Sequence, residues 1–429
     1  ACVHRGTIPS KTLRETALHI SELRRRIGHV VNFDMPPDLQ LATLMERMHS
    51  VVSAHVDYQG RQIQRNGIAH LHGRASFVDA HTLVVESVYG ERRFVRGDVI
   101  VIATGSRPRT PPDVPIDHEH VYDSDSILGM AYLPRTLTVL GGGVIASEYA
   151  TIFAALGVKV TMIDRAPRPL GFLDAEILDR FVASFEARGS TYVGNAKLVE
   201  VAWNGVDAVV TRLDNGWEVR GDKLLCALGR VANVDGLCIE AAGLSTDARG
   251  HIAVDRDCRT AVPHVFAVGD VIGPPSLASA SMEQGRRAMR AALDLPVPNG
   301  VDLIPAGVYT LPEIGSIGER EADARARGVE PLVGRANFAE IARGQISGAQ
   351  DGMLKLVVEP ESLRILGCQA IGEGATELVH LAQMAMVAGD DVHVFVDRIF
   401  NFPTMAEAYR VAALDVIGRA SRRAAGAPQ

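Results

Sequence analysis

Paired cysteines, long apolar runs and an excess of basic residues are all missing from this sequence. None of its five cysteines forms a C-x-x-C pair, and the number is odd, so neither a disulfide framework nor a metal site is expected. Such cysteine usage is typical of the reducing cytoplasm, the location we expect. No apolar run approaches the roughly 20 residues that a membrane helix needs. The net charge of -7 argues against nucleic acid or an anionic membrane as the main partner.

The chain is long enough for several hydrophobic cores. It has 429 residues, of which 47% are hydrophobic, and about two to four domains are expected from that length. The first elements predicted are a helix capped by Ser10 that ends near Arg26 and a second helix with an apolar stripe from Leu41 to Val52. Short strands follow within residues 69–102, before a proline-rich linker.

Residues 136–164 predict a strand, a glycine turn, a helix and a second strand, in that order. The turn matches the G-x-G-x-x-A form of a dinucleotide-binding loop. Gly141 would permit the tight turn, Gly143 would let the backbone approach a pyrophosphate, and Ala146 would allow close helix–strand packing. The helix N-terminus would offer N–H donors and a positive dipole to the phosphates. Nucleotide binding is therefore expected, with a plain glycine turn as the alternative.

Charged residues at the end of the second strand bear on the choice of nucleotide. Asp164 would suit the ribose 2′-hydroxyl of NAD, whereas Arg165 and Arg168 beside it would suit the 2′-phosphate of NADP. The mixture favours use of both cofactors. The alternative is that the two arginines are solvated surface groups.

Two further turns follow predicted buried strands. Ala103-Thr104-Gly105 follows the strand at 98–102, and Gly269-Asp270 follows a strand that begins near His264. Together and in this order they resemble the FAD-domain signatures of the class I pyridine nucleotide–disulfide oxidoreductases. The resemblance extends over essentially the whole chain. It implies an α/β protein with two Rossmann-like nucleotide-binding domains, for FAD and for NAD(P), and a C-terminal α+β dimerisation domain.

The resemblance also implies roles and boundaries. Asp270, with Gly269, would bind the FAD ribitol, and Thr104 and Gly105 would pack near the flavin phosphates. Gly229 resembles part of the exit motif of the NAD(P) domain. The implied FAD domain covers residues 1–133 and 250–300, the NAD(P) domain 134–249 and the dimerisation domain 301–429. We therefore expect a homodimer with nucleotides as its small-molecule partners.

The redox motif of the family is incomplete here. Members carry C-x4-C followed by I-P-S/T-K; Cys2 matches the first cysteine, but Thr7 stands in place of the second. A hydroxyl cannot form a disulfide, so dithiol chemistry is excluded at this position. Lys11 matches the lysine that lies by the flavin in relatives, and Glu148 matches its carboxylate partner, so both are implied to be catalytic.

The family's acid–base residue is missing as well. Relatives with the disulfide carry H-P-T-x-x-E near the C-terminus, but Phe402 replaces the histidine here, and phenylalanine cannot transfer a proton. Glu407 remains, with a structural role expected. A chain that lacks both the second cysteine and the histidine resembles the flavin-dependent, Si-specific NAD(P) transhydrogenases of the family. The implied activity is hydride transfer between NADPH and NAD through FAD.

Two alternatives stay open from the sequence. One is another NAD(P)H–flavin reductase, or diaphorase, with an external acceptor; the other is an inactive flavoprotein fragment. The second arises because the family's first FAD motif, G-x-G-x-x-G, precedes the redox cysteine in relatives and is absent from this chain. We expect the sequence to be truncated at its start rather than the natural protein to lack the motif, since the other FAD signatures are intact.

Overall fold

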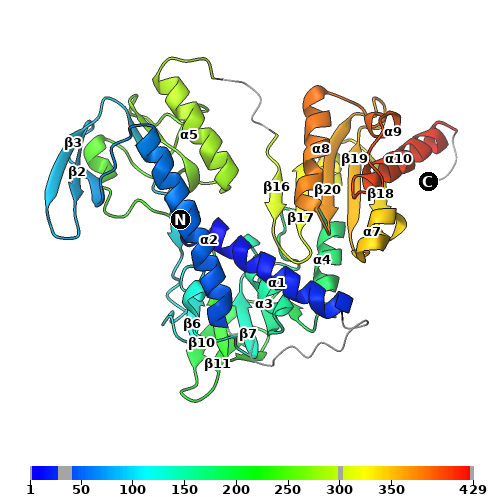
Figure 1. Ribbon diagram of the computed structural model, residues 1–429, viewed down its shortest axis with the longest axis horizontal. Helices are drawn as coiled ribbons and strands as arrows, with labels where there is room; N and C mark the ends of the chain where they lie inside the picture. The colour runs from blue at the N-terminus through cyan, green and yellow to red at the C-terminus, as the bar shows by residue number, and fades with distance from the viewer. Residues whose placement is uncertain (1, 28–40, 298–302, 426–429) are drawn as a thin grey trace. The chain divides into compact units, whose positions relative to one another are not determined.

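The computed structural model describes residues 2–27, 41–297 and 303–425, apart from the side chains of 24–27. The chain divides into two compact units, each described separately below (Figure 1). Unit 1 comprises Ala1–Thr12, Met45–Pro111 and Leu228–Gly300. Unit 2 comprises Leu13–Leu44, Pro112–Ala227 and Val301–Gln429. Each unit therefore draws together segments that are distant in the sequence.

The centre of unit 1 is a pair of parallel strands, β4 (Ile100–Ile102) and β15 (Val265–Ala267). Side chains alternate across the pair. Ile100 and Ile102 pack into one apolar cluster, while Phe266 packs into another beside α5 (Ala278–Ala292). Both faces of the pair are thus covered, which explains why the two strand sequences are apolar throughout.

Two smaller sheets complete unit 1. Three antiparallel strands form one of them: β1 (Arg74–Phe77), β2 (Thr82–Glu86) and β3 (Arg92–Arg96). The other pairs β5 (Ser106–Pro108) with β14 (Arg230–Ala232), two segments more than 100 residues apart. Short 3-10 helices follow at η2 (Ile239–Ala242) and η3 (Gly269–Ile272). The β5–β14 pair marks where the chain leaves unit 1 and returns to it.

The first two helices differ in detail from the sequence-based prediction. Helix α1 (Thr7–Ile27) starts earlier than expected, so the prediction of Ser10 as its cap is wrong: Ser10 lies inside the first turn and donates to the Thr7 carbonyl. Helix α2 (Leu41–Arg65) buries Leu41 at the start of its stripe. Leu44 and Met48 are buried as well and Val52 is half-buried, so of the predicted stripe only Val51 is exposed.

Unit 2 contains a five-stranded parallel sheet. Its strands, in spatial order, are β6 (Val121–Asp123), β13 (Lys223–Cys226), β7 (Thr136–Leu140), β8 (Lys159–Ile163) and β9 (Thr191–Val193). Helices α3 (Val144–Ala155) and α4 (Ala175–Ala187) connect successive strands. The predicted strand–turn–helix–strand unit is therefore present, with its boundaries within a residue or two. An antiparallel sheet follows: β10 (Leu198–Trp203), β11 (Val209–Leu213) and β12 (Glu218–Gly221).

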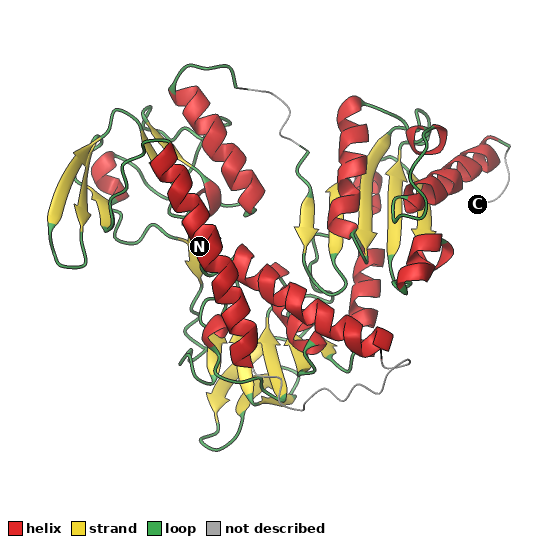
Figure 2. Cartoon of the chain, viewed as in Figure 1, coloured by secondary structure: helices red, strands yellow, loops and turns green. Residues whose placement is uncertain are grey.

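The C-terminal part of unit 2 is a five-stranded antiparallel sheet with helices (Figure 2). The strand order is β16 (Ala306–Val308), β17 (Ile314–Gly318), β20 (Ile365–Ile371), β19 (Met353–Val358) and β18 (Leu332–Asn337). Its helices are α6 (Glu321–Ala326), α7 (Ala342–Ser347), α8 (Ala375–Ala388), α9 (Val394–Asp397) and α10 (Glu407–Ala424), and the short 3-10 helix η4 (Phe338–Glu340) lies between β18 and α7. Another short 3-10 helix, η1 (Ile127–Gly129), lies earlier in the unit. Strand β19 sends Leu354 and Leu356 into one core with Val379 of α8 and Tyr409 of α10.

Alternate residues of β19 point to the opposite face, where one buried cation meets three carboxylates. Lys355 is 2% exposed, and its Nζ lies 3.0 Å from Asp174, 3.1 Å from Glu176 and 2.7 Å from Glu321. Arg335 on β18 joins the cluster through Glu176 at 2.9 Å. Asp174 is also the N-cap of α4, so the cluster connects the nucleotide-type sheet to the C-terminal sheet within unit 2.

The pKa values of the cluster follow from its contacts. Burial acts to raise the pKa of Glu176, but hydrogen bonds from Arg335 and Lys355 outweigh it and leave that pKa below its ordinary value. The pKa of Glu321 is lowered in the same way, against burial, by Lys355. Burial acts to lower the pKa of Lys355, yet Glu321 and Asp174 raise it overall. Glu176, Glu321 and Lys355 are therefore charged in the folded protein near neutral pH.

Replacing the buried lysine should destabilise the fold strongly. Lys355→Met leaves Asp174 buried without its cation, and we expect a loss of about 3–5 kcal/mol in the free energy of unfolding. Urea denaturation followed by circular dichroism measures it. Arg212→Gln, which breaks exposed ion pairs on β11, is the matched control and should cost less than about 1 kcal/mol. Equal losses for the two variants would contradict the assignment.

Acid should remove the same stabilisation. The folded pKa values of Glu176 and Glu321 lie below the ordinary 4.5, so their contribution is complete above that pH and is lost as the pH falls through the folded values. Wild type should therefore lose stability more steeply than Lys355→Met below about pH 4.5. Parallel pH profiles for the two proteins would count against the cluster.

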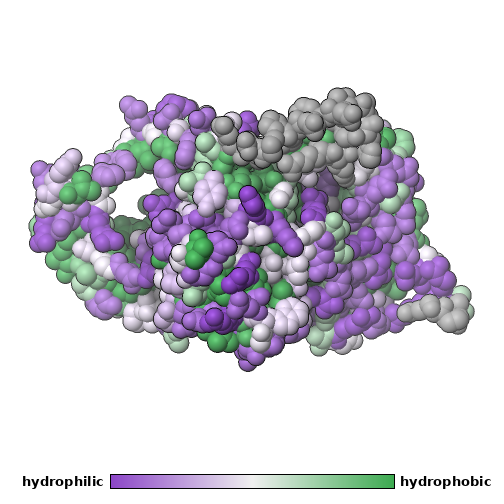
Figure 3. Space-filling model, turned by 90° about the horizontal axis from the view of Figure 1, so that it is seen from below, coloured by the Kyte–Doolittle hydropathy of each residue, from purple (hydrophilic) through white to green (hydrophobic). Residues whose placement is uncertain are grey.

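The molecular surface is mixed in character. Figure 3 shows hydrophilic and hydrophobic residues intermingled on the face that it draws. Within residues 2–27, 41–297 and 303–425, none of the helices combines the length and the hydropathy that a membrane crossing requires.

Candidate functional site

The glycine turn of unit 2 leaves a helix N-terminus open. Strand β7 ends at Leu140, and Gly141 then adopts a φ of 113°, which an L side chain rarely tolerates. Gly143 is the N-cap of α3, no side chain caps that helix, and a Cβ on Gly143 would meet open space. Ala146 is 0% exposed against the strand. These features suit a pyrophosphate, because backbone N–H groups remain available where the dipole is positive.

Asp164 lies beside this turn. A Cβ on Gly142 would come within 3.0 Å of the Asp164 carboxyl carbon, so only glycine fits there without a shift. The Asp164 carboxylate accepts a hydrogen bond from the Ala166 amide at 2.7 Å. Residues 164–170 then form a loop that returns to the turn, since the Leu170 amide donates to the Gly142 carbonyl at 2.7 Å. The predicted ribose carboxylate and the glycine turn are thus brought together.

The two arginines of this loop are not equivalent. Arg165 is exposed. Arg168 forms a two-pronged ion pair with Asp179 of α4, at 2.5 Å from Nε to Oδ1 and 3.1 Å from Nη2 to Oδ2. Its pKa is raised by the hydrogen bond and charge of Asp179. The sequence could not reveal this pairing, because Asp179 lies on the following helix.

Unit 1 holds the predicted flavin residues. Asp270 is the second residue of η3, which follows β15, and its carboxylate accepts a hydrogen bond from Ser106 Oγ at 2.6 Å. Ser106 in turn accepts from Arg230 Nε at 2.7 Å. Gly269 adopts a φ of 76°, and its amide donates to Gln284 at 2.8 Å. The β5–β14 pair therefore aligns the carboxylate through a serine and an arginine that sequence reasoning did not select as site residues.

Thr104, Gly105 and Gly229 lie at the start of the β5–β14 pair. Gly105 has a φ of 68° and its carbonyl accepts from the Asn233 amide at 2.8 Å. Gly229 has a φ of 104° and accepts from the Arg109 amide at 3.1 Å. Thr104 is exposed, with its carbonyl 3.4 Å from the Asn233 side chain. Both glycines thus permit sharp turns, and Thr104 and Gly105 lie two positions or fewer from Ser106.

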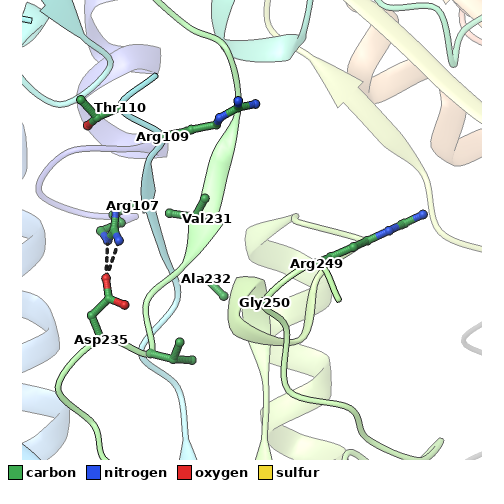
Figure 4. Close-up of a pocket in the computed structure, with 9 residues that line it drawn as sticks. Arg107, Arg109, Thr110, Val231, Ala232, Asp235, Arg249 and Gly250 are labelled. Carbon is green, nitrogen blue, oxygen red and sulfur yellow. Dashed lines mark hydrogen bonds and ion pairs between the residues drawn. The ribbon is translucent and has the colours of Figure 1, made fainter. Parts of the chain in front are cut away.

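A pocket of about 320 Å³ lies beside the same pair of strands. Arg107 and Asp235 point toward one another and form an ion pair, while Arg109 and Arg249 extend in other directions (Figure 4). Val231 contributes to an apolar floor. None of the predicted cofactor residues lines this pocket, so it is separate from the Asp270 site within unit 1.

The residues of the incomplete redox motif lie just before α1 and in its first turns. Thr7 is the first residue of α1, and Cys2 accepts through its carbonyl from the Ile8 amide at 3.0 Å. Cys2 is a free, half-buried thiol. Lys11 lies one turn into α1 and is half-buried. No disulfide occurs among the described cysteines.

Glu148 belongs to unit 2 and is 4% exposed on α3. Its Oε1 accepts a hydrogen bond from the Tyr309 amide at 3.0 Å, and Thr151, one turn later, accepts from the Leu311 amide at 3.2 Å. Glu148 therefore holds the segment after β16 in addition to any catalytic role, a contact that the sequence did not predict. Burial and nearby carboxylates raise the pKa of Tyr309.

The C-terminal motif has a structural carboxylate. Phe402 is 75% exposed. Glu407 is the first residue of α10 and accepts from the Thr404 amide at 3.0 Å, a contact that agrees with the structural role expected for it. The cis bond between Phe402 and Pro403 lies just before this contact.

The chain belongs to the pyridine nucleotide-disulphide oxidoreductase family. The family model matches residues 1–285, and the family's dimerisation domain matches residues 304–413. The expected fold class, two Rossmann-like domains with a C-terminal dimerisation domain, is thereby confirmed. FAD and NAD(P) are the cofactors of this family, as expected.

Similar proteins narrow the class further. The chain is 40% identical to the soluble pyridine nucleotide transhydrogenase of Mycobacterium tuberculosis, over 97% of this chain and 89% of that protein. It is 42% identical to the protein of the same name from Hahella chejuensis, over 97% and 90% of the two chains. Among solved structures it is similar to LpdA from Mycobacterium tuberculosis, with a TM-score of 0.89, 26% identity and coverage of 96% and 90%.

The described residues fit both cofactors. The uncapped N-terminus of α3 with the open Cβ position at Gly143 provides a cradle for a dinucleotide pyrophosphate. In unit 1, Asp270 is an acceptor already oriented by Ser106, as a polyol chain would require.

Removing the serine tests the Asp270 site. Ser106→Ala deletes a hydrogen bond to the Asp270 carboxylate and should weaken FAD binding about fivefold to thirtyfold, from the roughly 1–2 kcal/mol that such a bond contributes. Fluorescence titration of the apoprotein with FAD measures it. Ser87→Ala, at an exposed turn between β2 and β3, is the control. Unchanged FAD affinity in Ser106→Ala would refute the positioning role.

Proposed function

We propose that this protein is a flavin-dependent NAD(P) transhydrogenase, which transfers hydride between NADPH and NAD through FAD. The observation that supports this proposal most strongly is the match to soluble pyridine nucleotide transhydrogenases at about 40% identity along 97% of the chain. The chemistry of the redox motif supports it. Because Thr7 replaces the second cysteine and Phe402 replaces the histidine, this motif has no dithiol that could accept reducing equivalents from the flavin.

In this proposal the turn of unit 2 binds the nicotinamide nucleotides. Gly141, Gly143 and Ala146 shape the turn for the pyrophosphate. Asp164 accepts from the ribose hydroxyls, and Arg165 lies beside it on the same loop. Gly229 supplies the sharp turn at which the chain leaves this domain. Binding here orients the nicotinamide and excludes water from the transferred hydride.

The flavin residues act in the same proposal from unit 1 and from α3. Thr104, Gly105, Gly269 and Asp270 hold FAD, with Asp270 on the ribitol. Bound FAD supplies a two-electron carrier between the two nicotinamide half-reactions. Lys11 provides a fixed positive charge for reduced FAD, and Glu148 is the second residue to which the proposal gives a catalytic role. These assignments rest on the family motifs that the residues match.

The organisation of the protein completes the proposal. Residues 1–133 with 250–300 form the FAD domain, 134–249 the NAD(P) domain and 301–429 the dimerisation domain. The match to the family's dimerisation domain supports a homodimer. A cytoplasmic location agrees with the free thiols and with the pools of both nucleotides. Transfer at the Si face of the nicotinamide ring is part of the proposal.

Steady-state kinetics should show alternation at one site. The described residues contain one G-x-G-x-x-A turn, so NADPH must leave as NADP before NAD enters. Double-reciprocal plots for NADPH and thio-NAD should therefore be parallel. Converging lines would contradict a shared site. Diaphorase activity with a quinone but no nucleotide-to-nucleotide transfer would contradict the proposed function itself.

Removing the proposed positive charge beside FAD should slow the reduction of the flavin and leave nucleotide binding unchanged. Lys11→Met should lower the rate of flavin reduction by NADPH by about tenfold to a thousandfold, because a preorganised positive charge is lost. Stopped-flow absorbance measures it. Lys197→Met, an exposed lysine before β10, is the control. A normal rate in Lys11→Met would remove Lys11 from the catalytic group.

A further inference from the structure

The loop that would meet the 2′ position of a nucleotide is held at both ends. At one end Asp164 accepts from the Ala166 amide, and the Ala166 carbonyl accepts from Tyr192 Oη at 2.9 Å and from the Asn195 amide at 3.2 Å. At the other end the Leu170 amide donates to Gly142. The residues between these anchors therefore lie between the proposed ribose carboxylate and the phosphate turn.

Arg168 lies within this loop but is engaged elsewhere. Its guanidinium makes the two-pronged contact with Asp179, and the side chains of the two residues are 46% and 58% exposed. Exposed ion pairs contribute little net stability, because water and salt screen them and two long side chains must be ordered. The Arg168–Asp179 pair is therefore formed but easily exchanged for a stronger anion.

We propose that Asp179 determines the balance between NAD and NADP by holding Arg168 in an ion pair that the 2′-phosphate of NADP displaces. This inference rests on the proposed function, since it assumes that the nucleotide ribose lies at Asp164. A phosphate carries more negative charge than one carboxylate and can accept two hydrogen bonds from a guanidinium, so it competes effectively for Arg168. The neutral 2′-hydroxyl of NAD does not compete, and Arg168 stays with Asp179.

Such an exchange would let one site bind two nucleotides whose 2′ groups differ in charge. Asp164 favours a ribose hydroxyl but repels a 2′-phosphate. A permanently free arginine would favour NADP at all times, whereas an arginine restrained by Asp179 offers its charge only when a phosphate is present. Arg165, the other arginine of the loop, is exposed. The net preference is then set by how firmly Asp179 retains Arg168.

Binding of two redox-inert probes to the holoenzyme tests the inference. Wild type, Asp179→Asn, Arg168→Gln and the double variant are titrated with 2′,5′-ADP and with 5′-AMP by isothermal titration calorimetry. Asp179→Asn should bind 2′,5′-ADP about threefold to tenfold more tightly, because the competing carboxylate is gone. Arg168→Gln should bind it about tenfold more weakly. The affinity for 5′-AMP should be the same in all four proteins.

The double variant decides whether Asp179 acts through the arginine. It should match Arg168→Gln; if Asp179→Asn tightens 2′,5′-ADP binding equally in both backgrounds, the carboxylate acts only by simple repulsion and the inference is overturned. Asp179→Glu, which keeps the carboxylate, should retain the wild-type ratio of the affinities for 2′,5′-ADP and 5′-AMP. Glu200→Gln, which breaks a comparable exposed pair with Arg212, should leave the ratio of the two affinities unchanged.

The remaining outcomes separate this inference from the function on which it rests. Wild type that transfers hydride and binds both probes, with no change of ratio in Asp179→Asn, overturns the role of Asp179 and leaves the transhydrogenase proposal standing. Wild type that binds neither probe overturns the nucleotide site at Asp164, and the role of Asp179 with it.

Discussion

A single buried cation connects the parts of unit 2. Lys355 sits among three carboxylates, and one of them, Asp174, is the N-cap of α4. A buried charge is tolerated only where its partners are close and well oriented, so this cluster restricts how the C-terminal sheet can pack against the nucleotide-type domain. The start of α4 is thereby fixed. Since α4 also carries Asp179, the position of that carboxylate opposite Arg168 depends on the same cluster.

Unit 1 is organised by a different constraint, the pairing of two strands far apart in the chain. Where β5 and β14 meet, Ser106 and Arg230 come together and orient Asp270 at the end of β15. Three separate segments thus build one acceptor. The positive φ values of Gly105 and Gly229 allow the chain to turn into and out of this pair. The flavin site and the crossing between units therefore share the same backbone.

The fold was largely predictable because its strongest signals are local. The glycine turn, the strand before it and the helix after it follow from apolar periodicity and from the conformations that only glycine adopts easily. Element ends were less certain, as Ser10 shows: its side chain bonds within the first turn, and the helix starts at Thr7 instead. A capping serine and a first-turn serine have the same sequence signature, and only the backbone distinguishes them.

The chemistry of the site likewise depends partly on the sequence alone and partly on the tertiary structure. From the sequence alone came the loss of the disulfide, because Thr7 has no sulfur and Phe402 no transferable proton, and the pyrophosphate turn, because Gly141, Gly143 and Ala146 act through local conformation. Tertiary structure alone decided which partners these residues have. Ser106 and Arg230 meet Asp270, Tyr309 meets Glu148, and Asp179 meets Arg168 across separations that no local pattern encodes. The physical reason is that covalent capability belongs to a residue, whereas charge pairing and orientation belong to whatever the fold places beside it.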